Sequence, residues 1–161
     1  VSFEFFPPRS LEGSFRLWDC VNVLGPLGPE FVSVTYGAGG TTRQLTHEAV
    51  ETIHKTSGLT VAAHLTCVDA SREETLAIAD GYACVGVTDI VALRGDPPKG
   101  SDGFRPHPEG FASSVELVEA LARTGRFRIR VGAYPEKHPE AADTTADVEF
   151  LKRKFDAGAC S

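Results

Sequence analysis

Methionine is absent from this 161-residue chain, cysteine occurs four times and tryptophan once. The cysteines have neither CxxC nor Cys/His spacing, which argues against a zinc site or a disulfide framework and favours buried free thiols. They are Cys20, Cys67, Cys84 and Cys160. Because methionine is missing and Val1 already lies in an expected strand, we expect a fragment of a longer protein.

Long apolar runs and an excess of positive charge are also missing. No run approaches the roughly 20 apolar residues that span a bilayer, and no basic signal region opens the chain. The formal charge of -6 comes from scattered acids and disfavours nucleic-acid binding. The one basic cluster, Lys152, Arg153 and Lys154, most simply forms a solvated helix end, with contact to an anion as the alternative. We therefore expect small-molecule partners, no membrane contact and a cytoplasmic location.

The apolar residues that are present recur in a strand and helix pattern. Short runs rich in β-branched or aromatic residues predict five strands, near residues 1–6, 31–36, 60–66, 89–93 and 128–134. The stretches between them have helical spacing, as in Leu11, Phe15 and Trp18, or Val148, Leu151 and Phe155. The pattern repeats about every 30 residues, the length of one βα unit.

Capping signals delimit the expected helices. Ser71 with Glu74, and Ser113 with Glu116, have capping-box spacing at expected helix starts. Glycines at five positions are expected to end helices, because glycine tolerates the left-handed conformation. They are Gly28, Gly58, Gly86, Gly125 and Gly158.

Alternating strands and helices predict a single α/β domain over residues 1–161 with a parallel sheet, either doubly wound or closed as a barrel. A nucleotide-binding open sheet normally carries GxGxxG after its first strand, whereas this chain has FFPPRS. We therefore favour a (β/α)8 TIM barrel. A typical barrel needs about 250 residues, so only about its first five βα units are expected here.

One carboxylate, Glu4, stands among Phe3, Phe5 and Phe6 in the first expected strand. Burial among these rings would raise its pKa toward the range of a general acid. The alternative is an ordinary hydrogen bond or salt bridge at a strand end.

Polar side chains also stand at or near the expected carboxyl ends of all five strands: Glu4; Thr35 and Tyr36; His64 and Thr66; Arg94 and Asp96; Tyr134 and Glu136. Each has a structural explanation when taken alone, such as a core histidine or a local ion pair. Together they predict one ligand site, because parallel strands end on the same face. The glycine-rich loop 37–40 suits close approach of a ligand. No nucleophile triad or metal-ligand cluster is evident, so we expect an organic cofactor.

Six strings occur in order along nearly the whole chain: SFEFFPPR, FVSVTYGAGGTTR, AHLTC, IVALRGD, AYPEKHPEA and DVEFLKRKFDAGA. Together they resemble the methylenetetrahydrofolate reductase family. The resemblance implies a (β/α)8 barrel that holds FAD and reduces 5,10-methylenetetrahydrofolate to 5-methyltetrahydrofolate with NADH or NADPH, in one-carbon metabolism and methionine biosynthesis. It also suggests a homo-oligomer.

The same resemblance assigns roles to individual residues. Glu4 matches the general acid that protonates the folate, and Asp96 is implied to face both the folate pterin and the flavin. Thr35 matches a position near the nicotinamide. The implied FAD contacts are Tyr36, Ala38, His64, Arg94, Gly95, Asp96, Tyr134, His138, Ala141, Asp147 and Lys154.

The chain departs from the family pattern at two places. Ser113 and Ser114 stand where a Tyr-Ala pair is typical, so a flavin contact there rests on Ser114. Phe150 stands where bacterial relatives often have Asn. Because later barrel strands are missing, we expect residues 1–161 to be inactive alone and prone to aggregate through exposed edges. Two alternatives stay open: a flavin-free barrel enzyme, such as an aldolase or pterin-dependent methyltransferase, and a non-catalytic fragment that binds flavin or a partner.

Overall fold

The computed structural model describes residues 1–36, 43–97, 100 and 103–161. Its strands form one parallel sheet in the order β1-β2-β3-β4-β5. They are β1 (Ser2–Phe5), β2 (Phe31–Val34), β3 (Val61–Thr66), β4 (Asp89–Leu93) and β5 (Arg128–Val131). The five predicted strands are confirmed.

A helix follows each strand, as predicted: α1 (Leu11–Leu24), α2 (Arg43–Ser57), α3 (Arg72–Cys84), α4 (Ser114–Arg123) and α5 (Thr144–Asp156). A short 3-10 helix, η1 (Gly25–Leu27), extends α1. Ser71 and Glu74 form the predicted capping box of α3. At α4, Ser113 caps the helix as predicted, but the Glu116 carboxylate accepts from the Ala112 N–H instead of closing the box.

The five predicted helix-ending glycines all have positive φ, between 65° and 120°. At Gly158 the position is also crowded, since a Cβ there would stand 2.6 Å from the Cβ of Ala122. Glycine is therefore required where α5 turns back against α4.

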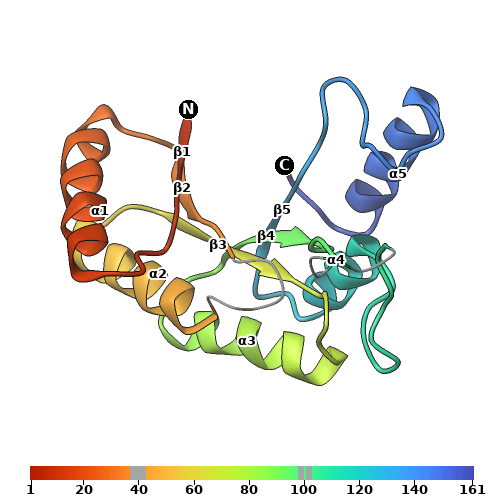
Figure 1. Cartoon of the computed structure of the whole chain (residues 1–161), viewed down its shortest axis with the longest axis horizontal. Coiled ribbons are helices and arrows are strands. Elements are labelled where there is room, and N and C mark those ends of the chain that lie inside the picture. The colour runs from red at the N-terminus through yellow and green to blue at the C-terminus, as the bar shows by residue number, and fades with distance from the viewer. Residues whose placement is uncertain (37–42, 98–99, 101–102) are drawn as a thin grey trace.

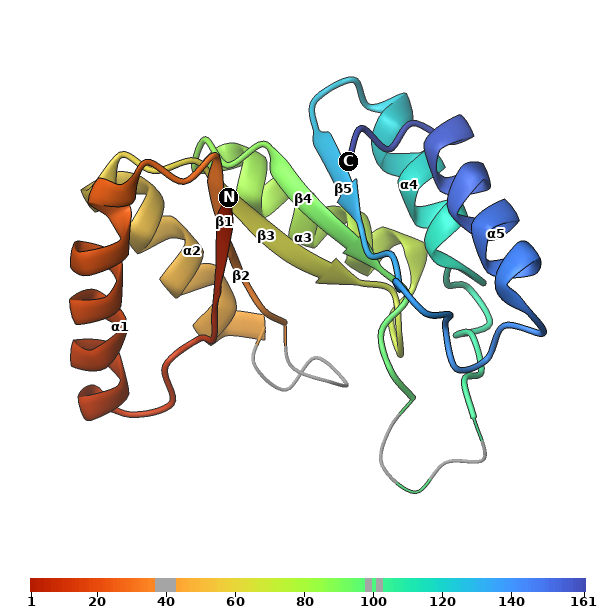
Figure 2. The same cartoon turned by 90° about the horizontal axis from the view of Figure 1, so that it is seen from above.

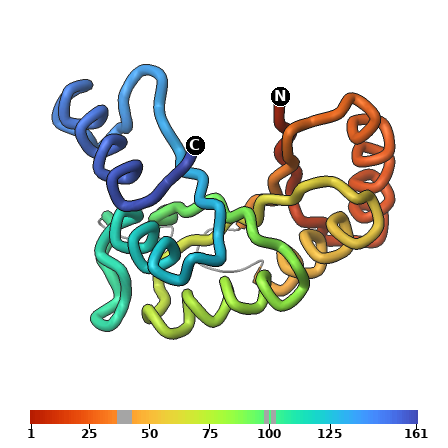
Figure 3. The backbone as a smooth tube through the Cα atoms, turned by 180° about the vertical axis from the view of Figure 1, so that it is seen from behind, coloured from red at the N-terminus to blue at the C-terminus, as the bar shows by residue number. Residues whose placement is uncertain are grey.

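The sheet curves, and its helices cover only its convex side (Figure 1). Both chain ends lie at the open side of this curve, as the view from behind also shows (Figure 3). Seen from above, the carboxyl ends of the strands all lie toward one end of the sheet (Figure 2). Consecutive strand order with helices on one side is consistent with part of a TIM barrel and differs from a doubly wound sheet.

The core lies between the convex side of the sheet and the helices. Alternation along each strand sends one set of side chains to this side. The set includes Val32 and Val34 of β2, Leu65 of β3 and Ile90 of β4, each at most 1% exposed. These residues pack in one cluster with helix side chains such as Val50, Ile53, Leu117 and Leu121.

The concave side of the sheet carries polar side chains. Arg130 of β5 and Asp89 of β4 form a buried ion pair, with the Arg130 Nη2 3.0 Å from the Asp89 Oδ1. The Arg130 guanidinium also lies 3.6 Å from the centroid of the Phe31 ring. This cluster joins β2, β4 and β5 near the amino ends of the strands.

The expectation that the four cysteines are buried is wrong in part. Cys67 is buried, which raises the pKa of its thiol to about 11, but Cys20, Cys84 and Cys160 are exposed. All four cysteines are free.

The helix patterns at both ends of the sheet predict the helices correctly but not their buried sides. Leu11 and Phe15 of α1 are 74% and 63% exposed, and Leu17 and Val21 face the core instead. In α5 no residue is fully buried. Both helices lie at the ends of the curved layer, where a neighbouring element covers only one side.

The two edges of the sheet differ. Among the described residues, β1 pairs only with β2. Beside β5, the Cys160 N–H donates to the Ile129 carbonyl at 2.8 Å and the Val131 N–H donates to the Ser161 carbonyl at 2.8 Å. The edge of β5 is therefore partly covered by backbone. In the part of the chain that the structure describes, no helix has the length and apolar character to cross a membrane.

Candidate ligand-binding site

A pocket of about 480 Å³ lies at the carboxyl ends of β3, β4 and β5, against α5. Its volume is in the range of small-molecule sites. Ten of the residues singled out from the sequence line it: Tyr36, Arg94, Gly95, Asp96, Ser114, Tyr134, His138, Ala141, Asp147 and Lys154. Side chains distant in sequence thus share one cavity, as the grouping of strand ends predicts. Their contacts with a ligand stay predictions.

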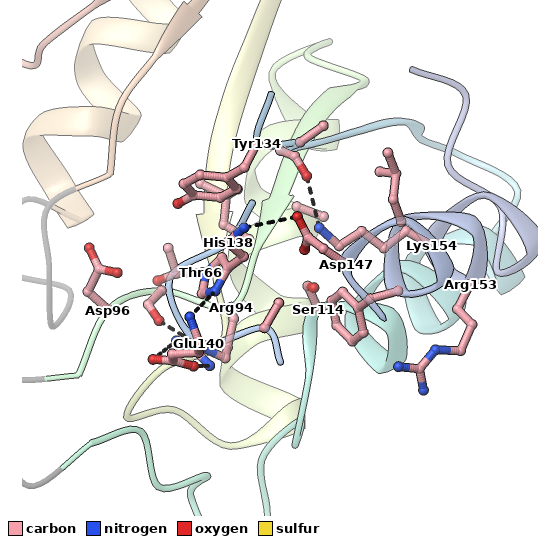
Figure 4. A pocket seen from close by; sticks show the side chains of 18 of the residues that line it. Thr66, Arg94, Asp96, Ser114, Tyr134, His138, Glu140, Asp147, Arg153 and Lys154 are labelled. Carbon is pink, nitrogen blue, oxygen red and sulfur yellow. Dashed lines mark hydrogen bonds and ion pairs between the residues drawn. The ribbon is translucent and has the colours of Figure 1, made fainter. Parts of the chain in front are cut away.

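Arg94 joins two walls of the pocket. Its Nη1 and Nη2 atoms donate to the two carboxylate oxygens of Glu140 at 2.6 Å and 3.0 Å (Figure 4). This bidentate bond raises the pKa of Arg94 and lowers that of Glu140. The Phe104 ring lies 4.5 Å from the guanidinium. A fixed cation therefore stands at the end of β4, directly before Gly95.

The loop after β5 is tied to the start of α5. The backbone N–H of His138 donates to the Asp147 carboxylate at 2.9 Å, and the His138 Nδ1 accepts from the Glu140 N–H at 3.1 Å. The Tyr134 ring meets the His138 ring edge-on at 4.8 Å. These contacts order one wall of the pocket without a ligand.

Lys154 is a half-buried cation on the α5 side of the pocket. Its Nζ donates to the Gly132 carbonyl at 2.9 Å, so α5 is joined to the end of β5 (Figure 4). Burial lowers the pKa of this amine, and the charge of Asp147 partly opposes that effect. Lys154 is therefore not the solvated helix end that the basic cluster suggested, whereas its neighbours Lys152 and Arg153 are exposed.

Gly95 lines the pocket directly after Arg94. Its φ is +87°, and a Cβ there would lie 2.6 Å from the Val68 Cγ1. We predict that Gly95→Ala lowers the free energy of unfolding by about 1–3 kcal/mol, through backbone strain and overpacking. Urea unfolding of the full-length protein measures this.

Gly132→Ala is the matched control for that variant. Gly132 also lines the pocket, but a Cβ there would meet only the Leu93 Cδ2, at 3.5 Å, an ordinary contact. We expect its effect to lie within about 1 kcal/mol of zero. Equal losses in both variants would contradict the steric argument at Gly95.

Three sequence-predicted site residues lie outside this pocket. Glu4 and His64 meet on the concave side of the sheet, with the His64 Nε2 3.2 Å from the Glu4 Oε2. Thr35 follows β2, and its N–H donates to the Phe5 carbonyl at 2.9 Å. Ala38 and the glycine-rich loop lie outside the described residues.

The expected burial of Glu4 among phenylalanines is wrong. Its side chain is 54% exposed, and it has a polar partner, the His64 imidazole, as the alternative interpretation expected. Strand alternation explains this, because Phe3 and Phe5 point to the helix side of the sheet while Glu4 points to the concave side. Phe6, beyond the strand, is 74% exposed.

Sequence reasoning missed several lining residues. Glu140 lies in the AYPEKHPEA string, but its pairing with Arg94 spans 46 positions and has no local signal. Thr66 was one of the polar strand ends predicted to share the site, although no ligand contact was assigned to it, and it lines the pocket. Arg153 also does, together with the apolar side chains of Val148, Phe150 and Leu151.

The chemistry of this lining fits an elongated ligand with anionic and aromatic parts. Arg94, His138 and Lys154 supply cations or donors suited to phosphate oxygens. The apolar side of α5 and the ring of Tyr134 supply flat contact surface. A dinucleotide cofactor meets both conditions. No group of three or more His, Cys, Asp or Glu suited to a metal ion occurs among the residues that the structure describes.

These features define an α/β protein with a pocket at the carboxyl edge of a parallel sheet, the usual position for ligands in such folds. The chain matches the family described as Methylenetetrahydrofolate reductase over residues 1–160. It belongs to this family.

Curated relatives agree with the family match. A Salmonella typhimurium protein named 5,10-methylenetetrahydrofolate reductase is 50% identical over 159 residues, covering 99% of this chain and 52% of the relative. The protein of that name from Escherichia coli gives the same identity and coverage. A rice protein named probable methylenetetrahydrofolate reductase (NADH) is 37% identical over 172 residues. That match covers 98% of this chain and 28% of the rice protein. The chain therefore spans about half the length of its bacterial relatives.

Proposed function

We propose that the full-length protein containing this chain is a flavin-dependent oxidoreductase that reduces 5,10-methylenetetrahydrofolate to 5-methyltetrahydrofolate. The observation that carries the proposal is the pocket, which gathers the resemblance-implied FAD contacts of β4, β5 and α5 around one cavity. Family membership supports the same reaction. We further propose that the strands complete an eight-unit barrel in the longer protein.

FAD, when bound, would supply the hydride-transfer chemistry between the nicotinamide nucleotide and the folate. Arg94, His138 and Lys154 would bind its pyrophosphate and hold it at the edge of the sheet. The Asp96 carboxylate, which lines the same pocket, would disfavour a full negative charge on the reduced ring. Glu4 would protonate a folate ring nitrogen and so assist opening of the methylene bridge.

Several parts of the proposal rest on the family alone. The reductant is NADH or NADPH, and the name of the rice relative makes NADH the first to assay. From family membership we also propose that the full-length protein acts in one-carbon metabolism, is cytoplasmic and forms a homo-oligomer. The departures at Ser114 and Phe150 both lie in the pocket lining, so they bear on the strength of flavin binding and not on Glu4.

Lys154→Gln tests the pocket as the flavin site. Removing one charge-assisted bond to phosphate costs about 1.5–3 kcal/mol, so FAD affinity of the full-length protein should fall about ten- to a hundredfold. Lys152→Gln is the matched control, because Lys152 is exposed on the same helix and does not line the pocket. Titration of flavin fluorescence measures both. Equal affinities in the two variants would argue against a phosphate contact at Lys154.

The Lys154 amine should also make FAD affinity depend on pH. Its lowered pKa means that Lys154 loses its proton at a lower pH than an exposed lysine. FAD affinity should therefore decline as the pH rises through that pKa, and Lys154→Gln should lack the decline. The titration repeated across alkaline pH measures it.

Product formation tests the function itself. We expect the full-length protein, reconstituted with FAD and supplied with NADH or NADPH, to form 5-methyltetrahydrofolate from 5,10-methylenetetrahydrofolate. We expect residues 1–161 alone to form none, because the remaining walls of the site would be missing. Turnover of a folate without flavin would instead favour a flavin-free barrel enzyme.

A further inference from the structure

The contact between Glu4 and His64 crosses a whole strand. Glu4 is on β1, His64 is on β3, and β2 runs between them. Strands lie about 4.8 Å apart, so the two side chains bridge roughly twice that spacing. The β2 residue level with Glu4 is Ser33, whose small side chain leaves room for the bridge. The pair is therefore a product of the fold and not of sequence proximity.

The two partners differ in environment. His64 is 8% exposed, and burial lowers the pKa of its imidazole, with the Glu4 charge opposing the shift. A neutral imidazole is therefore the dominant form near neutral pH. The Glu4 side chain is 54% exposed toward the open concave side. One partner is fixed in the sheet, and the other faces the space where a substrate would approach.

Other charges on this side of the sheet do not act on the histidine directly. His64 is level with Val91 of β4, an apolar residue. Asp89, Arg128 and Arg130 lie toward the amino ends of the strands and pair with one another. Among the residues that the structure describes, Glu4 is the charged group that contributes to the shifted titration of His64.

Hydrogen-bond chemistry fixes the direction of the contact. An ionised carboxylate only accepts, so in a hydrogen bond across this 3.2 Å contact a neutral His64 would be the donor, through its Nε2–H. The second oxygen, Oε1, is then the one left to take up a proton. When that proton passes to a substrate nitrogen, the carboxylate that remains keeps the N–H bond from His64.

We propose that His64 is the positioning residue of Glu4: its Nε2–H holds the Oε2 atom and directs the acidic proton to Oε1, on the open side of the site. This inference rests on the proposed function. The contact would also keep the Glu4 carboxylate in place after proton transfer to the folate.

Half-reaction kinetics of the full-length, FAD-loaded protein test the role. His64→Ala should slow folate-driven reoxidation of the flavin at least tenfold more than it slows flavin reduction by the nicotinamide nucleotide. The KM for the folate should change less than the rate of this step, because the variant alters the placement of the acid and not the binding of the substrate. His64→Gln, which keeps an N–H donor, should recover part of the lost rate. His54→Ala, on the convex side in α2, is the matched control.

A second measurement separates the pairing from the reaction. The imidazole of His64 is titrated by NMR in the wild type and in Glu4→Gln. The pKa of His64 should fall in the variant, because the charge that raises it is gone. If the wild type reduces no folate, the proposed function fails, while this shift still reports the pair. An unchanged His64 titration would overturn the pairing. Equal slowing of both half-reactions by His64→Ala would overturn the positioning role.

Discussion

Replacing Glu4 by glutamine in the full-length protein should slow the folate half-reaction by about 10²–10⁴-fold, the usual contribution of a general acid. Reduction of the flavin by NADH or NADPH should stay near its wild-type rate, because Glu4 lies outside the pocket implied to hold the flavin. Stopped-flow absorbance of each half-reaction, measured without oxygen, separates the two steps. Glutamine keeps the size of the side chain and its hydrogen-bonding capacity but carries no acidic proton.

A different outcome at Glu4 would change its assignment. Equal losses in both half-reactions would indicate a structural role, exerted through the contact with His64. Glu30→Gln is a suitable control, because Glu30 is an exposed acid outside the pocket that pairs loosely with Arg128 at 3.4 Å. It should leave the ratio of the two rates unchanged.

The second large effect is on stability. Asp89→Ala should lower the free energy of unfolding of the full-length protein by about 3 kcal/mol, because it removes the buried anion of Arg130 and leaves only the exposed Glu30 carboxylate, 3.6 Å from the Arg130 Nη1. The side chains of Arg130 and Asp89 are 6% and 9% exposed, so water cannot replace the lost partner. Equilibrium unfolding in urea measures the loss.

An exposed pair on the helix side gives the comparison. Asp80 pairs with Arg126, and both side chains are about half exposed. Asp80→Ala should therefore cost less than about 1 kcal/mol. Similar costs for the two variants would mean that the buried pair has no special part in holding β4 and β5 together.

Much of the fold was predictable from local signals. Short β-branched runs, helical spacing and helix-ending glycines each act over a few residues, and all five βα units follow from them. The position of the pocket was predictable for the same reason, because parallel strands end together, and its role as a ligand site stays a prediction. The closed barrel itself is a proposal, since the structure has five strands of it.

What sequence could not supply is the pairing between distant side chains. Glu140 meets Arg94 only because the loop after β5 folds over the end of β4. Lys154 reaches the Gly132 carbonyl across the gap between α5 and β5. No regular sequence spacing predicts either contact, because each depends on how α5 and the loop after β5 pack against the sheet.

Glu4 shows how a local signal can mislead. Phenylalanines adjacent in sequence suggested burial, but alternation places Phe3 and Phe5 on the opposite side of β1. Its buried partner, His64, comes from two strands away. The environment of Glu4 is thus set by strand order, and its expected chemistry depends on that partner.

The flavin spectrum of the full-length protein tests the central claim most directly. After reconstitution with FAD and removal of unbound cofactor, the account predicts a retained flavin absorbance band. The band should bleach with NADH or NADPH in the absence of oxygen and return when 5,10-methylenetetrahydrofolate is added. A protein that retains no flavin, or whose reduced flavin does not respond to the folate, would contradict the account.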